Sequence, residues 1–205
     1  MDEVKEKILV ESETLFMRFG FKSITMDDVA RELGISKKTL YLHFTDKHEL
    51  VNQCVEHHLE RINATCNAVI EQKEDAISAL LGITQFTSTM LKSVSQSSMY
   101  DLKKYFKTAW DKLEENRKEF IYSSIKSNLE LGIKKGLYRK DIHPEIIGRI
   151  YVHLVGFLID PENYDRDDMD LRTMHLEIVK YHLHAVCTDK GQEILTDKLK
   201  SFNKK

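Results

Sequence analysis

Apolar residues recur at intervals of three and four along nearly the whole chain, which is the spacing of amphipathic helices. Only two prolines and eight glycines interrupt the 205 residues, so few positions oppose a helical backbone. This pattern predicts an all-α fold. A chain of this length can bury a substantial core, either as one large domain or as two small ones.

The first predicted helix carries an apolar stripe that includes Ile8, Phe16 and Phe19 and ends near Gly20. Glycine is common just beyond the last turn of a helix because it adopts left-handed backbone angles without strain. The chain then continues through Phe21 and is expected to form a small core with this stripe. We interpret the segment as a support for the two short helices that follow.

Two capping signals separated by a glycine predict a helix-turn-helix. Thr25 and Asp28 have the three-residue spacing of a capping box, and Ser36 takes the capping position of the second helix. Gly34 between the helices provides the backbone freedom that a sharp turn needs.

The second short helix is expected to bury Leu40 and Phe44, four residues apart, and to direct polar side chains outward. Lysine neutralises phosphate, and threonine, tyrosine and histidine offer polar groups to base edges. The alternative is an ordinary solvated helix face, but the caps and the turn glycine agree with DNA binding. The candidate DNA-contacting residues are Thr25, Ser36, Lys37, Lys38, Thr39, Tyr41, His43 and Lys47.

The charge balance requires any DNA affinity to come from a local patch. The chain has 31 lysines and arginines against 33 acidic residues, for a formal net charge of -2. Arg31, Lys37, Lys38 and Lys47 provide such a patch. The N-terminus lacks an apolar signal core and no window is apolar enough to span a bilayer, so we expect a cytoplasmic protein with no membrane partner.

Longer amphipathic segments follow the helix-turn-helix. We expect a linking helix after Asp46, a helix from about Asp75 to Val94, one from Trp110 to Gly136, one opened by Pro144, and a final helix from Leu171. The predicted division is a DNA-binding domain at residues 1–48 and a helical ligand-binding and dimerisation domain at residues 49–205.

Two sets of residues in the second domain are candidates for binding. Aromatic residues and methionine with a few polar groups are typical of a small-molecule pocket, although they also fill helical cores. The candidate pocket residues are Phe86, Met90, Tyr105, Phe106, Trp110, Tyr122 and His153. The last two expected helices either pack on their own domain or pair with a second chain, and dimerisation is favoured because it gives helix-turn-helix proteins palindrome selectivity. The candidate interface residues are Ile147, Tyr151, Leu154, Leu158, Leu171, Met174, Ile178 and Tyr181.

Other chemistry is less well supported. Cys54 and His58 have the four-residue spacing of a helical metal site, but packing in the linking helix explains both, so we expect no metal and no cofactor. The three cysteines are interpreted as reduced and packed. No nucleophile elbow, phosphate loop or paired-carboxylate motif appears, so we do not expect an enzyme.

The segment from Phe19 to Leu50 resembles the DNA-binding domain of the TetR family of bacterial transcriptional regulators. The shared pattern comprises Phe19-Gly20-Phe21, Thr25, Val29-Ala30, Gly34-Ile35-Ser36, Thr39-Leu40-Tyr41, His43-Phe44, Lys47 and Leu50. Lys38 departs from it, since many relatives have a small residue there.

The resemblance implies a homodimer whose helix from Lys37 to His43 enters the major groove of double-stranded DNA at a palindromic operator. It also implies a repressor that a small apolar or amphipathic effector releases. The alternatives are a constitutive DNA-binding protein that senses nothing and a helical enzyme.

Overall fold

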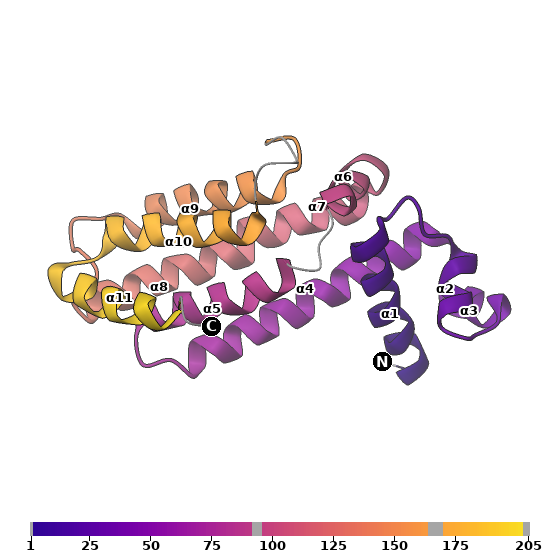
Figure 1. The fold of residues 1–205 in the computed structure, drawn as a ribbon, viewed down its shortest axis with the longest axis horizontal. Helices are drawn as coiled ribbons and strands as arrows, with labels where there is room; N and C mark the ends of the chain where they lie inside the picture. The colour runs from indigo at the N-terminus through magenta and orange to yellow at the C-terminus, as the bar shows by residue number, and fades with distance from the viewer. Residues whose placement is uncertain (1, 92–95, 164–169, 203–205) are drawn as a thin grey trace. The chain divides into compact units, whose positions relative to one another are not determined.

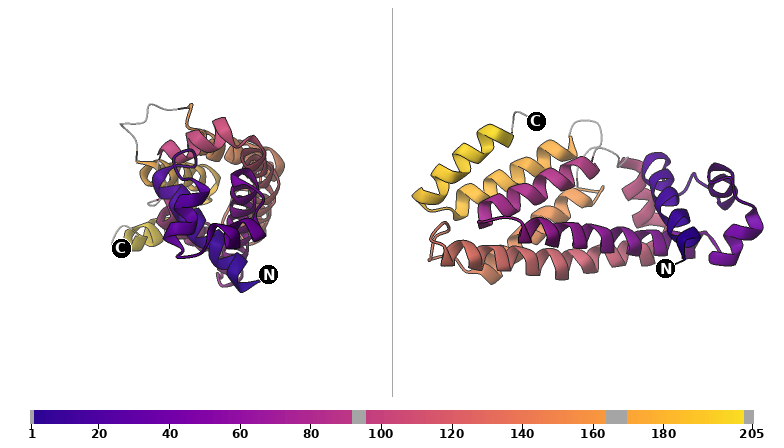
Figure 2. Two further views of the ribbon diagram at one scale, coloured as in Figure 1. Left: turned by 90° about the vertical axis from the view of Figure 1, so that its right-hand side faces the viewer. Right: turned by 90° about the horizontal axis from the view of Figure 1, so that it is seen from below.

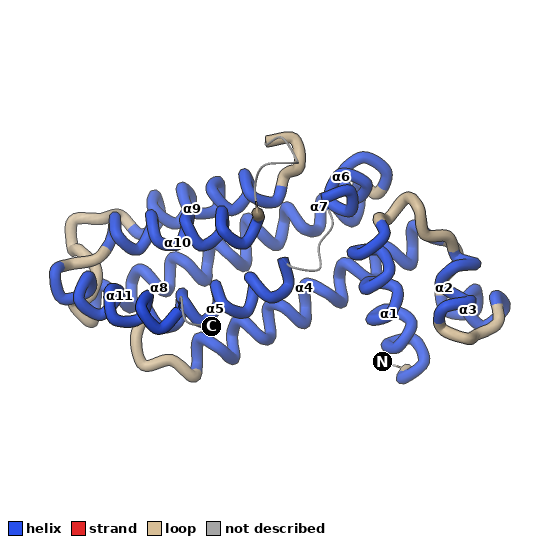
Figure 3. The backbone as a smooth tube through the Cα atoms, viewed as in Figure 1, coloured by secondary structure: helices blue, strands red, loops and turns tan. Residues whose placement is uncertain are grey.

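The computed structural model describes residues 2–91, 96–163 and 170–202. Within these ranges the chain is helical, with short connections and no β-strand, which confirms the all-α prediction (Figure 3). The helices are α1 (Glu3–Phe19), α2 (Met26–Glu32), α3 (Lys37–His43), α4 (Lys47–Glu71), α5 (Ala76–Leu91), α6 (Gln96–Tyr105), α7 (Lys107–Asn116), the π-helical turn η1 (Arg117–Ile121), α8 (Tyr122–Lys134), α9 (Pro144–Ile159), α10 (Leu171–Val186) and α11 (Asp189–Phe202) (Figure 1).

The described residues form two compact units that alternate along the sequence. Unit 1 lies within Met1–Asn63, Ser93–Asn116 and Asp160–Arg166, and unit 2 lies within Ala64–Lys92, Arg117–Ile159 and Asp167–Lys205. Helix α4 contributes its first part to unit 1 and its last part to unit 2. These units do not follow the division at residue 48, because α6 and α7 join the N-terminal helices. The division into a DNA-binding domain at residues 1–48 and a ligand-binding and dimerisation domain at residues 49–205 stays a prediction.

Unit 1 is built on an apolar core beneath the short helices. Phe16 and Phe21 stack with ring centroids 5.2 Å apart, and Phe106, from the α6–α7 junction, lies 6.1 Å from Phe21. Leu40 and Phe44 are fully buried beneath α3, as the sequence predicts. Helix α6 packs on α1, and this contact is visible in Figures 1 and 2.

Unit 2 has its core among α5, α8, α9 and α10, which pack pairwise. Tyr138 is completely buried there, and its hydroxyl donates to Asn128 Oδ1 at 3.1 Å. Gly132 makes room for the Tyr138 ring, since a Cβ atom at 132 would overlap it. The core therefore depends on one close approach between α8 and the turn after it.

Two features of unit 2 differ from the sequence expectation. The segment from Trp110 to Gly136 is not one α-helix, because the π-helical turn η1 separates α7 from α8. A π turn changes the hydrogen bonding of a single turn inside a helix, so the apolar spacing of the whole segment does not reveal it. Helix α11 is absent from the helices that the sequence pattern predicts. The end of the helix predicted from Asp75 to Val94 lies outside the described residues beyond Leu91.

Two histidines of α10 are buried in unit 2. His175 and His182 are 7% and 5% exposed, and burial lowers the pKa of each to about 4. His175 Nδ1 lies 3.4 Å from the Thr87 hydroxyl oxygen. His182 meets the Tyr151 ring edge-on at 4.8 Å, and its Nε2 has no hydrogen-bond partner among the described residues. Both imidazoles are therefore neutral in the folded protein at neutral pH.

We expect unit 2 to lose stability as the pH falls from about 6.5 towards 4. In that range the histidines of the unfolded chain bind protons, whereas the buried histidines of the folded protein stay neutral. The free energy of unfolding therefore falls by up to about 1.4 kcal/mol per histidine per pH unit. Urea denaturation followed by circular dichroism at pH 7, 6 and 5 measures the free energy of unfolding. His184→Gln, which removes an exposed histidine, should leave the dependence of this free energy on pH unchanged. His175→Gln/His182→Gln should make the free energy depend less on pH. A free energy that is constant from pH 7 to 5 would contradict the prediction.

Candidate nucleic-acid interface and ligand cavity

The turn between α2 and α3 is fixed by local hydrogen bonds. The Thr25 hydroxyl accepts from the Asp28 amide at 3.1 Å, and the Asp28 carboxylate accepts from the Thr25 amide at 3.0 Å, which confirms the capping box. The bonds from Thr25 hold the pKa of Asp28 below its ordinary value. Ser36 Oγ accepts from the Thr39 amide at 3.0 Å, and Gly34 has a positive φ of 65°. Helix α3 therefore begins in a fixed direction.

Helix α3 exposes a mixed polar and apolar face. Lys38 is exposed, Tyr41 is 48% exposed and Leu42 is 74% exposed. Leu42 is not among the residues that the sequence predicts to contact DNA, because leucine is expected in the core. Its position two residues after the buried Leu40 was the available signal, since that offset turns a side chain to the other side of a helix. An exposed leucine suits contact with a thymine methyl group.

The other candidate DNA contacts already have partners in the folded chain. The Lys37 ammonium pairs with Asp27 at 2.5 Å, and His43 Nε2 lies 3.9 Å from an Asp2 carboxylate oxygen. Thr25, Ser36 and Thr39 serve as caps or bond to a cap. Their roles in DNA binding stay predictions.

Lys47 is more enclosed than the sequence suggests. Its ammonium donates to the Lys22 carbonyl at 3.0 Å and lies 5.5 Å from the centre of the Phe106 ring. Burial lowers the pKa of this lysine, partly offset by Asp101. Asp101, a residue that the sequence reasoning did not single out, accepts from the Lys22 amide at 2.9 Å. Helix α6 therefore holds the turn that precedes α2.

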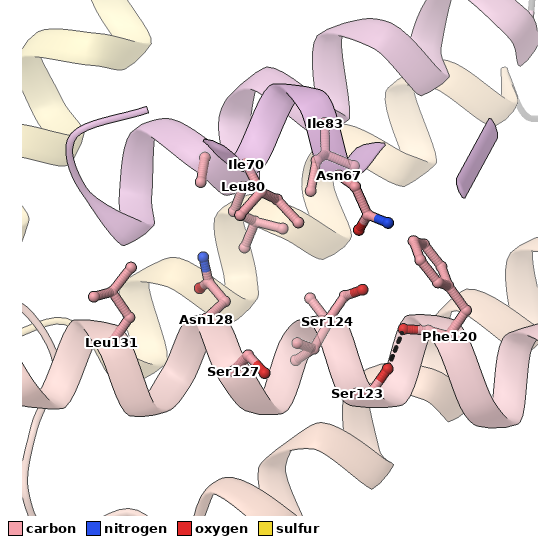
Figure 4. Close-up of a pocket in the computed structure, with 12 residues that line it drawn as sticks. Asn67, Ile70, Leu80, Ile83, Phe120, Ser123, Ser124, Ser127, Asn128 and Leu131 are labelled. Carbon is pink, nitrogen blue, oxygen red and sulfur yellow. Dashed lines mark hydrogen bonds between the residues drawn. The ribbon is translucent and has the colours of Figure 1, made fainter. Parts of the chain in front are cut away.

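Unit 2 contains a cavity of about 340 Å³ among the end of α4, α5, η1 and α8. Asn67 and Phe120 reach into it from opposite sides (Figure 4). The lining residues are uncharged: Asn67, Ile70, Ala79, Leu80, Ile83, Phe120, Ser123, Ser124, Ile125, Ser127, Asn128 and Leu131. Asn128 is held in place, because its amide donates to the Ala76 carbonyl at 2.8 Å.

The candidate pocket residues are divided between the two units. Tyr105, Phe106 and Trp110 belong to unit 1, whereas Phe86, Met90, Tyr122 and His153 belong to unit 2, and none lines this cavity. Phe106 and Trp110 are buried. The lining is instead rich in serine and asparagine, which aromatic content cannot reveal.

Comparison with known proteins agrees with this geometry. Residues 8–54 match the family model described as bacterial regulatory proteins, tetR family. The HTH-type transcriptional regulator YvaF of Bacillus subtilis is 27% identical over 160 residues, covering 77% of this chain and 82% of that protein. The chain is a TetR-family transcriptional regulator.

Two further similarities extend this assignment. Over 53 residues the regulator is 36% identical to IcaR of Staphylococcus epidermidis, named as a negative transcriptional regulator of a biofilm operon, covering 26% of this chain and 29% of IcaR. The structure of a transcriptional regulator from Cytophaga hutchinsonii superposes with a TM-score of 0.71 at 19% identity, covering 91% and 100% of the two chains. This second match shows the shared fold.

The regulator exposes an apolar stripe on α9. Ile146, Ile150 and Phe157 are 56%, 50% and 44% exposed and lie on one helix face. On the neighbouring α10, Tyr181 is 71% exposed, and Met174 and Ile178 are partly exposed.

Three of the candidate interface residues, Tyr151, Leu158 and Leu171, are buried within the protomer, and Tyr151 belongs to the core of unit 2. Helix α9 has apolar residues all round, so periodicity did not distinguish its two faces. Ile147 and Leu154 lie at the boundary between the faces and are partly exposed.

Cys54 and His58, which have the spacing of a helical metal site, each have a partner within the protein. Cys54 is buried and donates to the Leu9 carbonyl, and burial raises the pKa of its thiol. His58 instead faces Glu13 at 2.7 Å. Among the described residues, no three histidine, cysteine or acidic side chains gather as a metal site. None of the described helices has the length and apolar character needed to cross a membrane.

Proposed function

We propose that this TetR-family regulator is a homodimeric repressor that an uncharged small molecule releases from a palindromic operator. The observation that carries the DNA-binding role is the capped helix α3, which buries Leu40 while exposing Lys38, Tyr41 and Leu42. The similarity to IcaR, named as a negative regulator, favours repression.

In the proposed complex, α3 lies in the major groove. Tyr41 and Leu42 contact base edges, Lys38 contacts a phosphate, and the helix N-terminus at Ser36 approaches the backbone. Two such helices must lie about 34 Å apart to reach successive turns of DNA. This requirement makes binding sensitive to small changes within the dimer.

We expect Tyr41→Ala to weaken binding to DNA selected from a random pool by the wild-type protein, by about 1–3 kcal/mol. Binding to unselected duplexes should change little, because a base contact contributes little there. Lys38→Gln should weaken both kinds of binding and lower the salt dependence by about one unit. Fluorescence anisotropy at several salt concentrations measures both effects. Equal losses on both DNAs for the two variants would contradict these roles.

For the second subunit, the exposed stripe on α9 and the outer face of α10 are the proposed contact surface. A second copy of the chain is the occupant that a two-fold palindromic site requires. This face is apolar at Ile146, Ile150, Phe157 and Tyr181. Burying these side chains against a second copy would remove apolar area from water, which favours association.

Ile150→Asp should convert the dimer to a monomer at micromolar concentration. An unpaired carboxylate in the proposed interface should cost about 3 kcal/mol or more of association. Folding should be retained, because this side chain is half exposed in the protomer. Val4→Asp, at another exposed apolar position in α1, is the matched control and should remain dimeric. Sedimentation that finds the Ile150 variant as dimeric as wild type would place the interface elsewhere.

The cavity of unit 2 is the proposed effector site. Its volume is near the lower end of small-molecule sites, and none of its lining side chains is ionisable. A charged ligand would lose its hydration without gaining a counter-charge. An apolar body with a hydroxyl or amide group suits the isoleucine, leucine, serine and asparagine lining.

A matched set of probes tests this effector class. Decanol should raise the melting temperature and weaken DNA binding, whereas decanoate and decylammonium should do neither at equal concentration. To regulate, the ligand must favour the non-binding state by about 1–3 kcal/mol. Ser124→Phe should fill the cavity and abolish the response while leaving DNA binding intact. If neutral ligands bind but never change DNA affinity, a constitutive DNA-binding protein becomes the better interpretation.

A further inference from the structure

Two lysines of unit 1 converge on one tyrosine outside the helix-turn-helix. The Lys22 ammonium donates to the Tyr105 hydroxyl at 3.2 Å and lies 4.8 Å from the centre of that ring. The Lys104 ammonium lies 5.5 Å from the same ring and donates to the Tyr100 hydroxyl at 2.9 Å. Lys22, Lys104 and Tyr105 are exposed at the surface of unit 1. We refer to these three residues as the α6 basic cluster.

Neighbouring lysines pair with carboxylates, whereas the two lysines of the α6 basic cluster do not. Lys103 bonds to Asp160 and Glu162, and Lys107 bonds to Asp111. Among the described residues, neither Lys22 nor Lys104 has a carboxylate within ion-pair distance of its ammonium. The buried Asp101 uses a carboxylate oxygen on the Lys22 backbone amide.

The cluster offers donors that suit a phosphate group. Two ammonium groups near one ring repel each other, and a shared anion relieves that repulsion. The hydrogen bond from Lys22 lowers the pKa of Tyr105, with Lys104 contributing to the same shift. Lys104 also lies in the last turn of α6, where the helix dipole favours a cation, but this does not account for Lys22.

The cluster is continuous with the proposed DNA contacts. Lys22 lies three residues before Thr25, the cap of α2. The Lys22 carbonyl accepts a hydrogen bond from the Lys47 ammonium. We propose that Lys22, Lys104 and Tyr105 bind backbone phosphates of the same DNA duplex that α3 reads. The inference rests on the proposed function, because it extends that DNA interface to the end of α6.

Salt-dependent binding of the full chain to a labelled 24-bp duplex of random sequence tests the proposal. Lys22→Gln/Lys104→Gln should lower the slope of log affinity against log salt by about 1.8 units, or about 0.9 for each phosphate that the protein no longer neutralises. At 0.1 M salt the affinity should fall at least about tenfold. Glutamine leaves the Lys22 backbone bonds to Asp101 and Lys47 in place, and circular dichroism checks folding.

Three controls make the result specific. Lys107→Gln removes one positive charge from a lysine that is paired with Asp111 on α7, and it should leave the slope near that of wild type. Lys22→Arg/Lys104→Arg keeps both charges and should restore the wild-type slope. Lys38→Gln tests separately whether α3 contacts a DNA phosphate.

A double glutamine variant that matches Lys107→Gln, while Lys38→Gln lowers the slope, would overturn the phosphate site and leave the proposed function standing. If the wild-type protein bound no duplex at all, the phosphate site and the proposed function would both fail.

Discussion

The DNA-reading helix depends on apolar burial beneath it. Helices α2 and α3 have seven residues each, a length at which an isolated helix is unstable in water. Complete burial of Leu40 and Phe44 supplies the stability that local helix propensity cannot, and Phe16 and Phe21 of the supporting segment are buried as well. The direction in which Tyr41 and Leu42 point is therefore set by packing on the opposite side of α3.

Part of that support comes from a distant stretch of sequence. Ser98 on α6 lies within hydrogen-bond distance of the carbonyls of Phe16 and Met17 in the last turn of α1, and the Phe16 carbonyl also accepts from the Gly20 amide. Phe106 extends the aromatic core from the other end of α6. Unit 1 is thus more than an N-terminal domain, and changes in α6 or α7 act directly on the surroundings of the helix-turn-helix.

Local signals in the sequence predicted the features that local chemistry determines. The capping box at Thr25, the turn at Gly34 and the buried pair under α3 each depend on residues within about ten positions of one another. The π-helical turn, the outward face of α9 and the lining of the cavity depend on tertiary packing. Helix α9 shows the limit clearly, because Ile150 and Tyr151 are both apolar and only their neighbours determine which one is buried.

Hydrogen exchange of the backbone amides tests most directly whether α6 belongs to the structure that supports the reading helix. Phe106→Ala removes the aromatic contact with Phe21 but leaves every residue of α1, α2 and α3 unchanged. If unit 1 opens as one cooperative body, this substitution should lower the protection of amides in α1–α3 and in α6 by the same free energy. Loss of protection confined to α6 and α7, with α1–α3 as protected as in wild type, would contradict the account.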